Sequence, residues 1–161
     1  MAAVRITLIR TLRAALLTGA LYTGACAPIK LIADYDATSV EETIRVGKRV
    51  DLFYGKILEL DPPARVYAPF AEQYIDIEAD IRSLVRRNTM RPLNSESTRI
   101  SNIILDFWVQ YHKKHKEKNA YPDASLDRTR FDRLFTAALS AEAAKKVTGD
   151  STSSPASPPD R

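Results

Sequence analysis

The side chains that could carry chemistry in this sequence are one cysteine, two histidines and the lysines beside the histidines. Cys26 is the sole thiol, so it can form neither an intrachain disulfide nor a multi-cysteine metal site. His112 and His115 have the spacing of a metal-binding pair, but such a site needs at least one further ligand, and the neighbouring lysines repel a cation. We therefore expect no metal site and place both histidines at a solvated helix end.

The basic stretch Lys113–Lys118 contains four lysines: Lys113, Lys114, Lys116 and Lys118. Cations near a helix C-terminus stabilise the helix dipole, and this explains them without any partner. Alternatively, they contact anionic lipid headgroups or lipopolysaccharide phosphates, where each basic residue contributes about 1 kcal/mol. This second interpretation requires the stretch to lie against the membrane, because the Debye length is only about 8 Å.

Motifs of enzymes and cofactor sites are missing from the sequence. It has no nucleophile elbow, phosphate loop, zinc-protease motif or haem-attachment motif. No glutamate precedes either histidine by three residues, as a di-iron helical bundle would require. We expect a non-enzymatic protein without a cofactor.

Charge is distributed unevenly along the chain. The net charge is +4, but no acidic residue precedes Asp34, while Arg5, Arg10 and Arg13 all do. Loss of residues 1–25 would lower the net charge to +1, since that stretch holds three arginines and no acid. A nearly neutral mature chain argues against a general role in nucleic-acid binding.

The first 25 residues have the layout of a secretory signal peptide. A positive start is followed by an apolar run over 14–22 and by small residues before Cys26. The run is too short to span a membrane, which takes about 20 apolar residues. Two interpretations are an ordinary cleaved signal and a mitochondrial transit peptide. A third gives Cys26 a role of its own, because an unpaired thiol is disfavoured in an oxidising compartment unless it is used.

Thr23-Gly24-Ala25-Cys26 resembles the lipobox of bacterial lipoproteins, departing from it at Thr23, where leucine or valine is preferred. The resemblance implies lipidation of Cys26 and cleavage after Ala25. Ala27, rather than an aspartate, implies sorting to the outer membrane, facing the periplasm, more than retention at the inner membrane. The stretch CAPIKLIADYDATSVEETIRVGKRVD also resembles a group of small, functionally uncharacterised proteobacterial lipoproteins, which adds support for location and fold and implies no activity.

The remaining chain shows apolar residues at alternating spacings of four and three, the pattern of packed amphipathic helices. It predicts helices over 38–60, 69–88, 94–118 and 125–147, with a capping box at Thr38 or Ser39 starting the first. Pro62-Pro63 is expected to end the first helix. The predicted inward positions include Ile44 and Leu60 on the first helix, Phe70, Tyr74, Ile77, Ile81 and Leu84 on the second, and Phe131, Leu134, Ala138 and Ala141 on the fourth. Segment 26–37 is expected to be the lipidated cysteine and a linker, with Leu31, Ile32 and Tyr35 packed on the bundle. Gly149 is expected to end the ordered chain, leaving a disordered Ser/Pro-rich tail over 149–161.

These elements predict an all-α fold, an antiparallel up-down four-helix bundle with its domain over 38–148. The expected function is that of a membrane-anchored periplasmic lipoprotein that binds a protein partner in the cell envelope. The alternatives are a small-ligand-binding protein, with a pocket lined by Tyr54, Trp108 and Tyr111, and a membrane-surface element that uses Lys113–Lys118.

Overall fold

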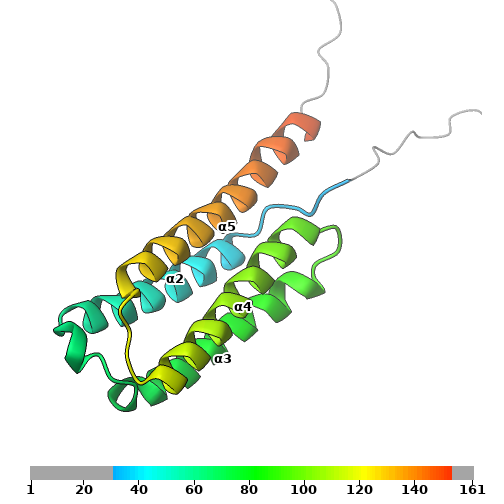
Figure 1. The fold of residues 1–161 in the computed structure, drawn as a ribbon. Helices are drawn as coiled ribbons and strands as arrows, with labels where there is room; N and C mark the ends of the chain where they lie inside the picture. Colours follow the sequence, from blue (N-terminus) through cyan, green and yellow to red (C-terminus); the bar gives the residue numbers. More distant parts are fainter. Residues whose placement is uncertain (1–30, 154–161) are drawn as a thin grey trace, which may run out of the picture. The chain divides into compact units, whose positions relative to one another are not determined.

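The computed structural model describes residues 31–153, so the predicted signal peptide, Cys26 and positions 154–161 lie outside the described residues. Four helices form the bundle in Figure 1: α2 (Ala37–Leu58), α3 (Ala71–Met90), α4 (Ser95–Lys118) and α5 (Ala124–Ser153). Two short 3-10 turns, η1 (Pro62–Ala64) and η2 (Ala68–Phe70), connect α2 to α3. The predicted all-α up-down bundle is confirmed.

The helices form a closed ring in which each packs on two neighbours. α2 packs on α3 and α5, and α4 packs on the same two helices from the other side. We call the end with the start of α2, the α3–α4 turn and the C-terminal half of α5 the proximal end. The distal end contains the α2–α3 connection and the α4–α5 turn. Within residues 31–153, no helix has an apolar stretch long enough to cross a membrane.

Apolar side chains at the four-three spacing form the core. On α3 and the turn before it, the predicted positions Phe70, Tyr74, Ile77, Ile81 and Leu84 are all buried. Aromatic rings fill the centre, where Phe53 meets the rings of Tyr54, Phe70, Tyr74 and Trp108 edge-on at centroid distances of 4.6–5.8 Å. Each such pair contributes about 0.5–1.5 kcal/mol beyond the area that it buries.

The start of α2 differs from the prediction. Asp36 is the N-cap, and its carboxylate accepts a hydrogen bond from the Thr38 amide at 3.1 Å. The predicted capping box was wrong because Ser39 lies inside the first turn and donates its hydroxyl proton to Asp36 at 2.7 Å. The helix therefore begins one residue before Thr38.

The end of α5 also differs, since the helix continues to Ser153 rather than stopping near Val147. Gly149 was expected to end the ordered chain by adopting a left-handed conformation, but no glycine in the described residues has a positive φ. A glycine inside a helix costs only about 1 kcal/mol relative to alanine, which does not stop the helix here. The tail was predicted to begin at residue 149, but α5 extends to Ser153.

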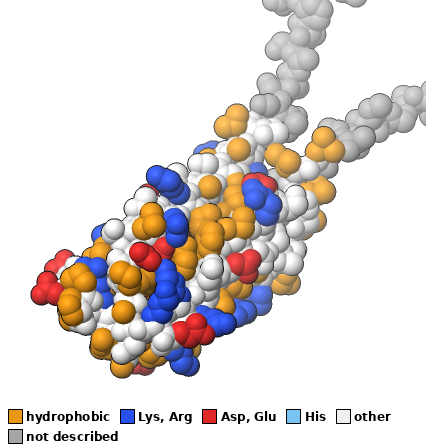
Figure 2. All heavy atoms as spheres, in the orientation of Figure 1, with side chains coloured by type: hydrophobic (Ala, Val, Ile, Leu, Met, Phe, Trp, Pro, Cys, Tyr) orange, Lys and Arg blue, Asp and Glu red, His pale blue; other side chains and the backbone are white. Residues whose placement is uncertain are grey.

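Five side chains expected to pack inward are exposed. Leu31 and Ile44 are largely exposed, Ile32 and Tyr35 are each 39% exposed, and in the segment before α2 it is Ala33 that is buried. Leu60 is exposed because α2 ends at Leu58, so the helical periodicity that would place the leucine on the inner face does not extend to it. Figure 2 shows the outer surface of one face, where charged side chains surround a central hydrophobic patch and further hydrophobic side chains lie at the proximal end.

Candidate functional site

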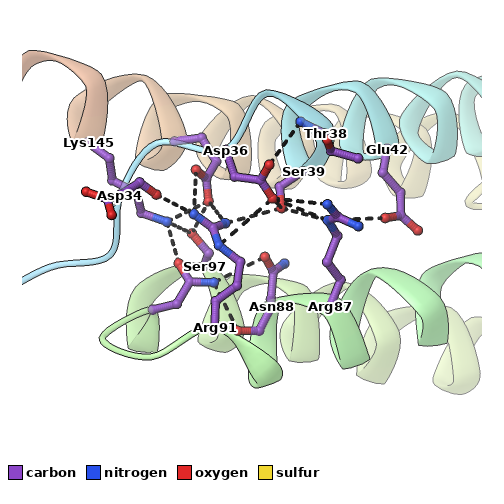
Figure 3. Close-up of polar contacts among 12 residues, drawn as sticks. Asp34, Asp36, Thr38, Ser39, Glu42, Arg87, Asn88, Arg91, Ser97 and Lys145 are labelled. Atoms are coloured by element: carbon purple, nitrogen blue, oxygen red, sulfur yellow. Dashed lines mark hydrogen bonds and ion pairs between the residues drawn. The ribbon is translucent and has the colours of Figure 1, made fainter. Parts of the chain in front are cut away.

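A cluster of charged and polar side chains at the proximal end joins the segment before α2 to the bundle. We call it the proximal clamp. It contains three acids and three bases, with polar side chains between them: Asp36, Glu42, Glu142, Arg87, Arg91, Lys145, Ser39, Asn94 and Ser97. These residues come from the segment before α2 and from α2, α3, the α3–α4 turn, α4 and α5, and Figure 3 labels all of them except Glu142 and Asn94.

The extended segment that precedes α2 is held at its backbone. The Ala33 amide donates to the Leu93 carbonyl oxygen at 3.0 Å, and the Arg91 guanidinium donates to the Asp34 carbonyl oxygen. These two bonds attach consecutive parts of the segment to the α3–α4 turn. The chain therefore enters the bundle in one fixed position rather than as a free linker.

Asp36 is the point where this segment becomes helix, and its carboxylate has partners on two helices. Beside its contacts with Thr38 and Ser39, it accepts from the Arg87 guanidinium at 3.2 Å. The Ser39 hydrogen bond, aided by the charge of Arg87, lowers the pKa of Asp36. The carboxylate is thus held in its charged form, which both caps α2 and pairs with α3.

Arg91 lies at the centre of the clamp. One terminal nitrogen donates to the Ser39 hydroxyl at 3.2 Å and to the Glu142 carboxylate at 2.8 Å. The other donates to the carbonyl of Asp34. A planar guanidinium offers five donors in a fixed fork, so this one side chain connects the entering segment to α2 and to α5.

Glu142 and Lys145 form a buried ion pair, with the two side chains only 3% and 7% exposed. The Lys145 ammonium also donates to the Ser97 hydroxyl at 2.7 Å and to the Asn94 side-chain oxygen. Burial raises the pKa of Glu142, but hydrogen bonds from Arg91 and Lys145 outweigh it, and the net effect lowers the pKa. Each of the three N–H groups of the Lys145 ammonium thus has an acceptor, on Glu142, Ser97 or Asn94.

Sequence reasoning missed this buried pair because the pair sits in an alanine-rich stretch that resembles a solvated helix end. A signal was nevertheless present, since Phe131, Phe135, Ala138, Glu142 and Lys145 follow alternating spacings of four and three. The charged residues thus continue the apolar face of α5. The sequence analysis assigned Leu134 and Ala141 to the inner face of α5, but both are only partly buried. Phe135, Glu142 and Lys145 are the buried positions.

A second network lies at the distal end; its tyrosines and Asp127 are buried, and Arg130 lies at the surface. The Tyr54 and Tyr121 hydroxyls lie 2.8 Å apart, and Tyr121 donates to the Asp127 carboxylate at 3.0 Å. Arg130 joins Asp127, at 2.9 Å, to the Tyr111 hydroxyl, at 3.0 Å. Burial raises the pKa of both Tyr54 and Tyr121, which keeps their hydroxyls protonated. Sequence reasoning did not single out Tyr121 or Asp127.

The two histidines belong to this distal end, and the expectation that they are solvated was wrong. His115 is buried, and its Nε2 lies 3.0 Å from the Arg65 carbonyl. Because a carbonyl only accepts, Nε2 is the donor, and Nδ1 of the neutral ring accepts from the Tyr74 hydroxyl at 3.0 Å. His112 stacks on the Tyr74 ring at 4.4 Å. Burial lowers the pKa of both imidazoles.

The histidines are covered because the α2–α3 connection folds over the end of α4. Tyr67 stacks on His112 and meets His115 edge-on, both at 5.7 Å. The polar and basic residues at the end of α4 gave no indication that residues of the α2–α3 connection cover the two histidines. In the part of the chain that the structure describes, no three His, Cys, Asp or Glu side chains are grouped so that they could hold a metal ion.

The basic stretch Lys113–Lys118 also lies at the distal end, on the last turns of α4. Lys114 pairs with Asp123 at 2.6 Å, and Lys113 lies 3.8 Å from Glu117. Lys116 and Lys118 are exposed. The stretch is thus partly neutralised and lies at the opposite end of the bundle from Leu31.

The aromatic residues expected to line a ligand pocket lie in the core, where Tyr54, Trp108 and Tyr111 are buried. A surface groove of about 220 Å³ runs between α2 and α5 and borders Tyr54, but Trp108 and Tyr111 do not line it. Its volume is below the roughly 300–1,000 Å³ typical of small-molecule sites. The groove therefore gives little support to a ligand-binding role.

No family model, curated protein or solved structure matches this chain. Of the two polar networks, only the proximal clamp holds the extended segment that precedes α2. It is therefore the candidate functional site.

Proposed function

We propose that this protein is a lipoprotein of the bacterial cell envelope, lipidated at Cys26 and anchored to the outer membrane on its periplasmic side. Its helical bundle acts without enzymatic activity by binding a protein partner. The observation that carries the proposal is the proximal clamp, which grips the chain seven residues after Cys26, at Ala33.

The clamp suits a tethered protein because it fixes the position of the tether on the bundle. Seven residues from Cys26 to Ala33 reach at most about 25 Å when fully extended. A lipid anchor with several acyl chains gains about 0.8 kcal/mol for each buried CH₂ group, which is enough for stable attachment. With the segment held at Ala33, Asp34 and Asp36, the anchor stays within about 25 Å of the proximal end.

A binding role, rather than catalysis, is supported by how the titratable groups are arranged. In the distal network the tyrosines, Asp127 and His115 are buried and hydrogen-bonded to one another. In the proximal clamp, acids and bases are matched in number. Leu52 on α2 and Ile75 on α3 are more than half exposed on the sides of the bundle, where a partner has access to them.

Metabolic labelling with palmitate tests the anchor. We expect the wild-type chain to be labelled and membrane-bound, and the Cys26→Ala variant to be unlabelled. Lys146→Met is a matched control, since it alters an exposed residue of the folded domain and should leave labelling intact. A wild-type chain that is unlabelled, soluble and still carries residues 1–25 would contradict the proposal.

Photo-crosslinking in intact cells tests the partner. A photoreactive residue at Ile75 or Leu52 is expected to yield a discrete adduct with an envelope protein. The same probe in the Cys26→Ala background reports on whether the adduct needs the anchor. If neither position, nor a pull-down of the wild-type chain, recovers an envelope protein above background, the binding role is wrong.

A further inference from the structure

Four large apolar side chains at the proximal end are more than half exposed, and we call them the apolar rim: Leu31, Met90, Leu93 and Val147. Their exposed fractions are 79%, 84%, 52% and 69%. They come from the segment before α2, the end of α3, the α3–α4 turn and α5. Isolated exposed leucines are ordinary, but four such side chains at one end of a bundle need an explanation.

Contacts in the clamp bring the four positions to the same end. Ala33, two residues after Leu31, is hydrogen-bonded to Leu93 at 3.0 Å. Met90 immediately precedes Arg91, and Val147 lies two residues beyond Lys145, which is bonded to Asn94 next to Leu93. Figure 2 shows hydrophobic side chains at this end, where the described chain begins and ends.

Leu93 gives a separate indication. Its φ of 59° is in the left-handed region, which glycine and asparagine adopt more readily than leucine. Its side chain is half exposed, so burial in the core does not offset the unfavourable backbone conformation. Neither the turn nor the core therefore accounts for a leucine at this position, whereas contact with an apolar surface outside the bundle does.

We propose that the apolar rim rests on the lipid bilayer to which the chain is anchored, so that the bundle stands on its proximal end. The inference depends on the proposed lipidation of Cys26. Leu31 follows Cys26 by five residues, which span at most about 18 Å, so the anchor holds the rim close to the headgroups. Apolar side chains of membrane-surface proteins are buried to about 5–10 Å at the boundary of headgroups and acyl chains.

Charge at the rim is compatible with a bilayer but does not drive the contact. Arg86, one turn before Met90, and Lys146, beside Val147, are both exposed and suit anionic headgroups. Asp34 and Glu96 bring negative charge to the same end, and Glu96 is paired with Arg99 at 2.7 Å. The balance is near neutral, so the apolar side chains carry the contact.

The standing orientation also determines which surfaces face away from the membrane. The 22 residues of α2 give the bundle a length of about 33 Å. Lys113–Lys118 would then lie several Debye lengths from the headgroups, where salt screens their charge. The sides of α2 and α3 would remain open to a partner.

Site-specific photo-crosslinking distinguishes this orientation from others. A benzophenone side chain is placed at Leu93 or at Leu126 in the full chain, produced in bacteria. Leu126, at the distal start of α5, is a matched control because both leucines are 52% exposed. We expect about tenfold more phospholipid adduct from position 93, since the reaction needs van der Waals contact. Similar lipid yields at the two positions, or a protein adduct in place of lipid at position 93, overturn the inference.

Palmitate incorporation, measured in the same cells, separates this inference from the proposed function. An unlabelled chain refutes the anchor itself, whereas a labelled chain without preferential lipid contact at position 93 refutes only the orientation. Leu93→Gly is a second variant that relaxes the backbone. It should melt at the same temperature as wild type or higher while lowering the lipid adduct formed by a probe at Met90. An unchanged adduct at Met90 would show that Leu93 does not contribute to the contact.

Discussion

The two ends of the bundle both bury polar groups, but they do so with different chemistry. The distal network is built mainly from neutral groups, tyrosine hydroxyls and imidazoles, with one ion pair, Asp127–Arg130. The proximal clamp is ionic, with the buried pair Glu142–Lys145 at its centre. The distal network joins helices and connections of the bundle to one another, whereas the clamp also holds an extended segment. Charge-assisted hydrogen bonds, which are about twice as strong as neutral ones, hold this segment at Asp34 and Asp36.

The electrostatic environments also differ. At the distal end, burial lowers the pKa of His112 and His115 and raises that of Tyr54, so each group favours its neutral form. At the proximal end, the pKa values of Asp36 and Glu142 are lowered, so both favour their charged form. The two ends should therefore respond to different variants and to different ranges of pH.

Breaking the buried ion pair should have the largest effect. Lys145→Met leaves the Glu142 carboxylate buried with one cation fewer, and loss of one partner of such a pair costs about 3–5 kcal/mol. Urea unfolding followed by circular dichroism measures the change in the free energy of unfolding. Lys146→Met removes only an exposed contact, that of the ammonium with the Tyr35 ring at 5.7 Å, and should change it by no more than about 1 kcal/mol. Equal effects of the two variants would mean that the clamp does not stabilise the fold.

Removing one hydroxyl from the distal network should have a smaller effect. Tyr121→Phe takes a donor from Asp127 and an acceptor from Tyr54, and an unsatisfied buried group costs about 1–3 kcal/mol. Amide hydrogen exchange should show faster exchange at the α4–α5 turn and unchanged protection of the Ala33 amide. Tyr35→Phe, on a more exposed ring, is the control. Loss of protection at Ala33 in Tyr121→Phe would mean that the two ends are not independent.

The N-cap of α2 should contribute less to the free energy of unfolding than the distal network does. Asp36→Ala removes the cap and the partner of Arg87, with an expected loss of about 0.5–2 kcal/mol. Asp36→Asn keeps the cap and removes the charge, so the difference between the two variants measures the contribution of capping. Both should speed hydrogen exchange of the segment before α2. If Asp36→Asn is as destabilised as Asp36→Ala, the charge rather than the cap dominates.

Mild acid should weaken the distal end first. A histidine whose folded pKa is lowered binds more protons when unfolded, so stability is fully present above the unfolded pKa of about 6.5 and falls as the pH drops below it. Each histidine adds at most about 1.4 kcal/mol per pH unit. For His112, the nearby Glu78 carboxylate opposes this effect and Lys116 adds to it.

Thermal melts between pH 8 and pH 5 test this dependence. His115→Asn should reduce the fall in melting temperature between pH 8 and pH 5. His112→Asn should remove only the part of that fall that comes from His112. Asp36 and Glu142 have lowered folded pKa values, so their contributions persist above the unfolded carboxylate pKa of about 4 and disappear at lower pH. A wild-type melting temperature that is constant from pH 8 to pH 5 would contradict the assignment of neutral buried histidines.

The sequence by itself determined the helices and their inward faces. The apolar spacing from Phe70 to Leu84 identified the core of α3, and Pro62-Pro63 correctly marked the gap after α2. This was possible because periodicity and backbone chemistry are local properties of the chain. The same local patterns fixed the up-down bundle, since short connections force consecutive helices to be antiparallel.

Only the tertiary structure decided which polar groups are buried. Glu142 and Lys145 require Arg91, Asn94 and Ser97 from the α3–α4 turn and from α4, and His115 requires the cover that the α2–α3 connection provides. Burial of a charge is favourable only when partners distant in sequence meet it with the right geometry. Spacing along one helix cannot report partners on another helix and on a distant turn, and for that reason the clamp was found in the structure and not in the sequence.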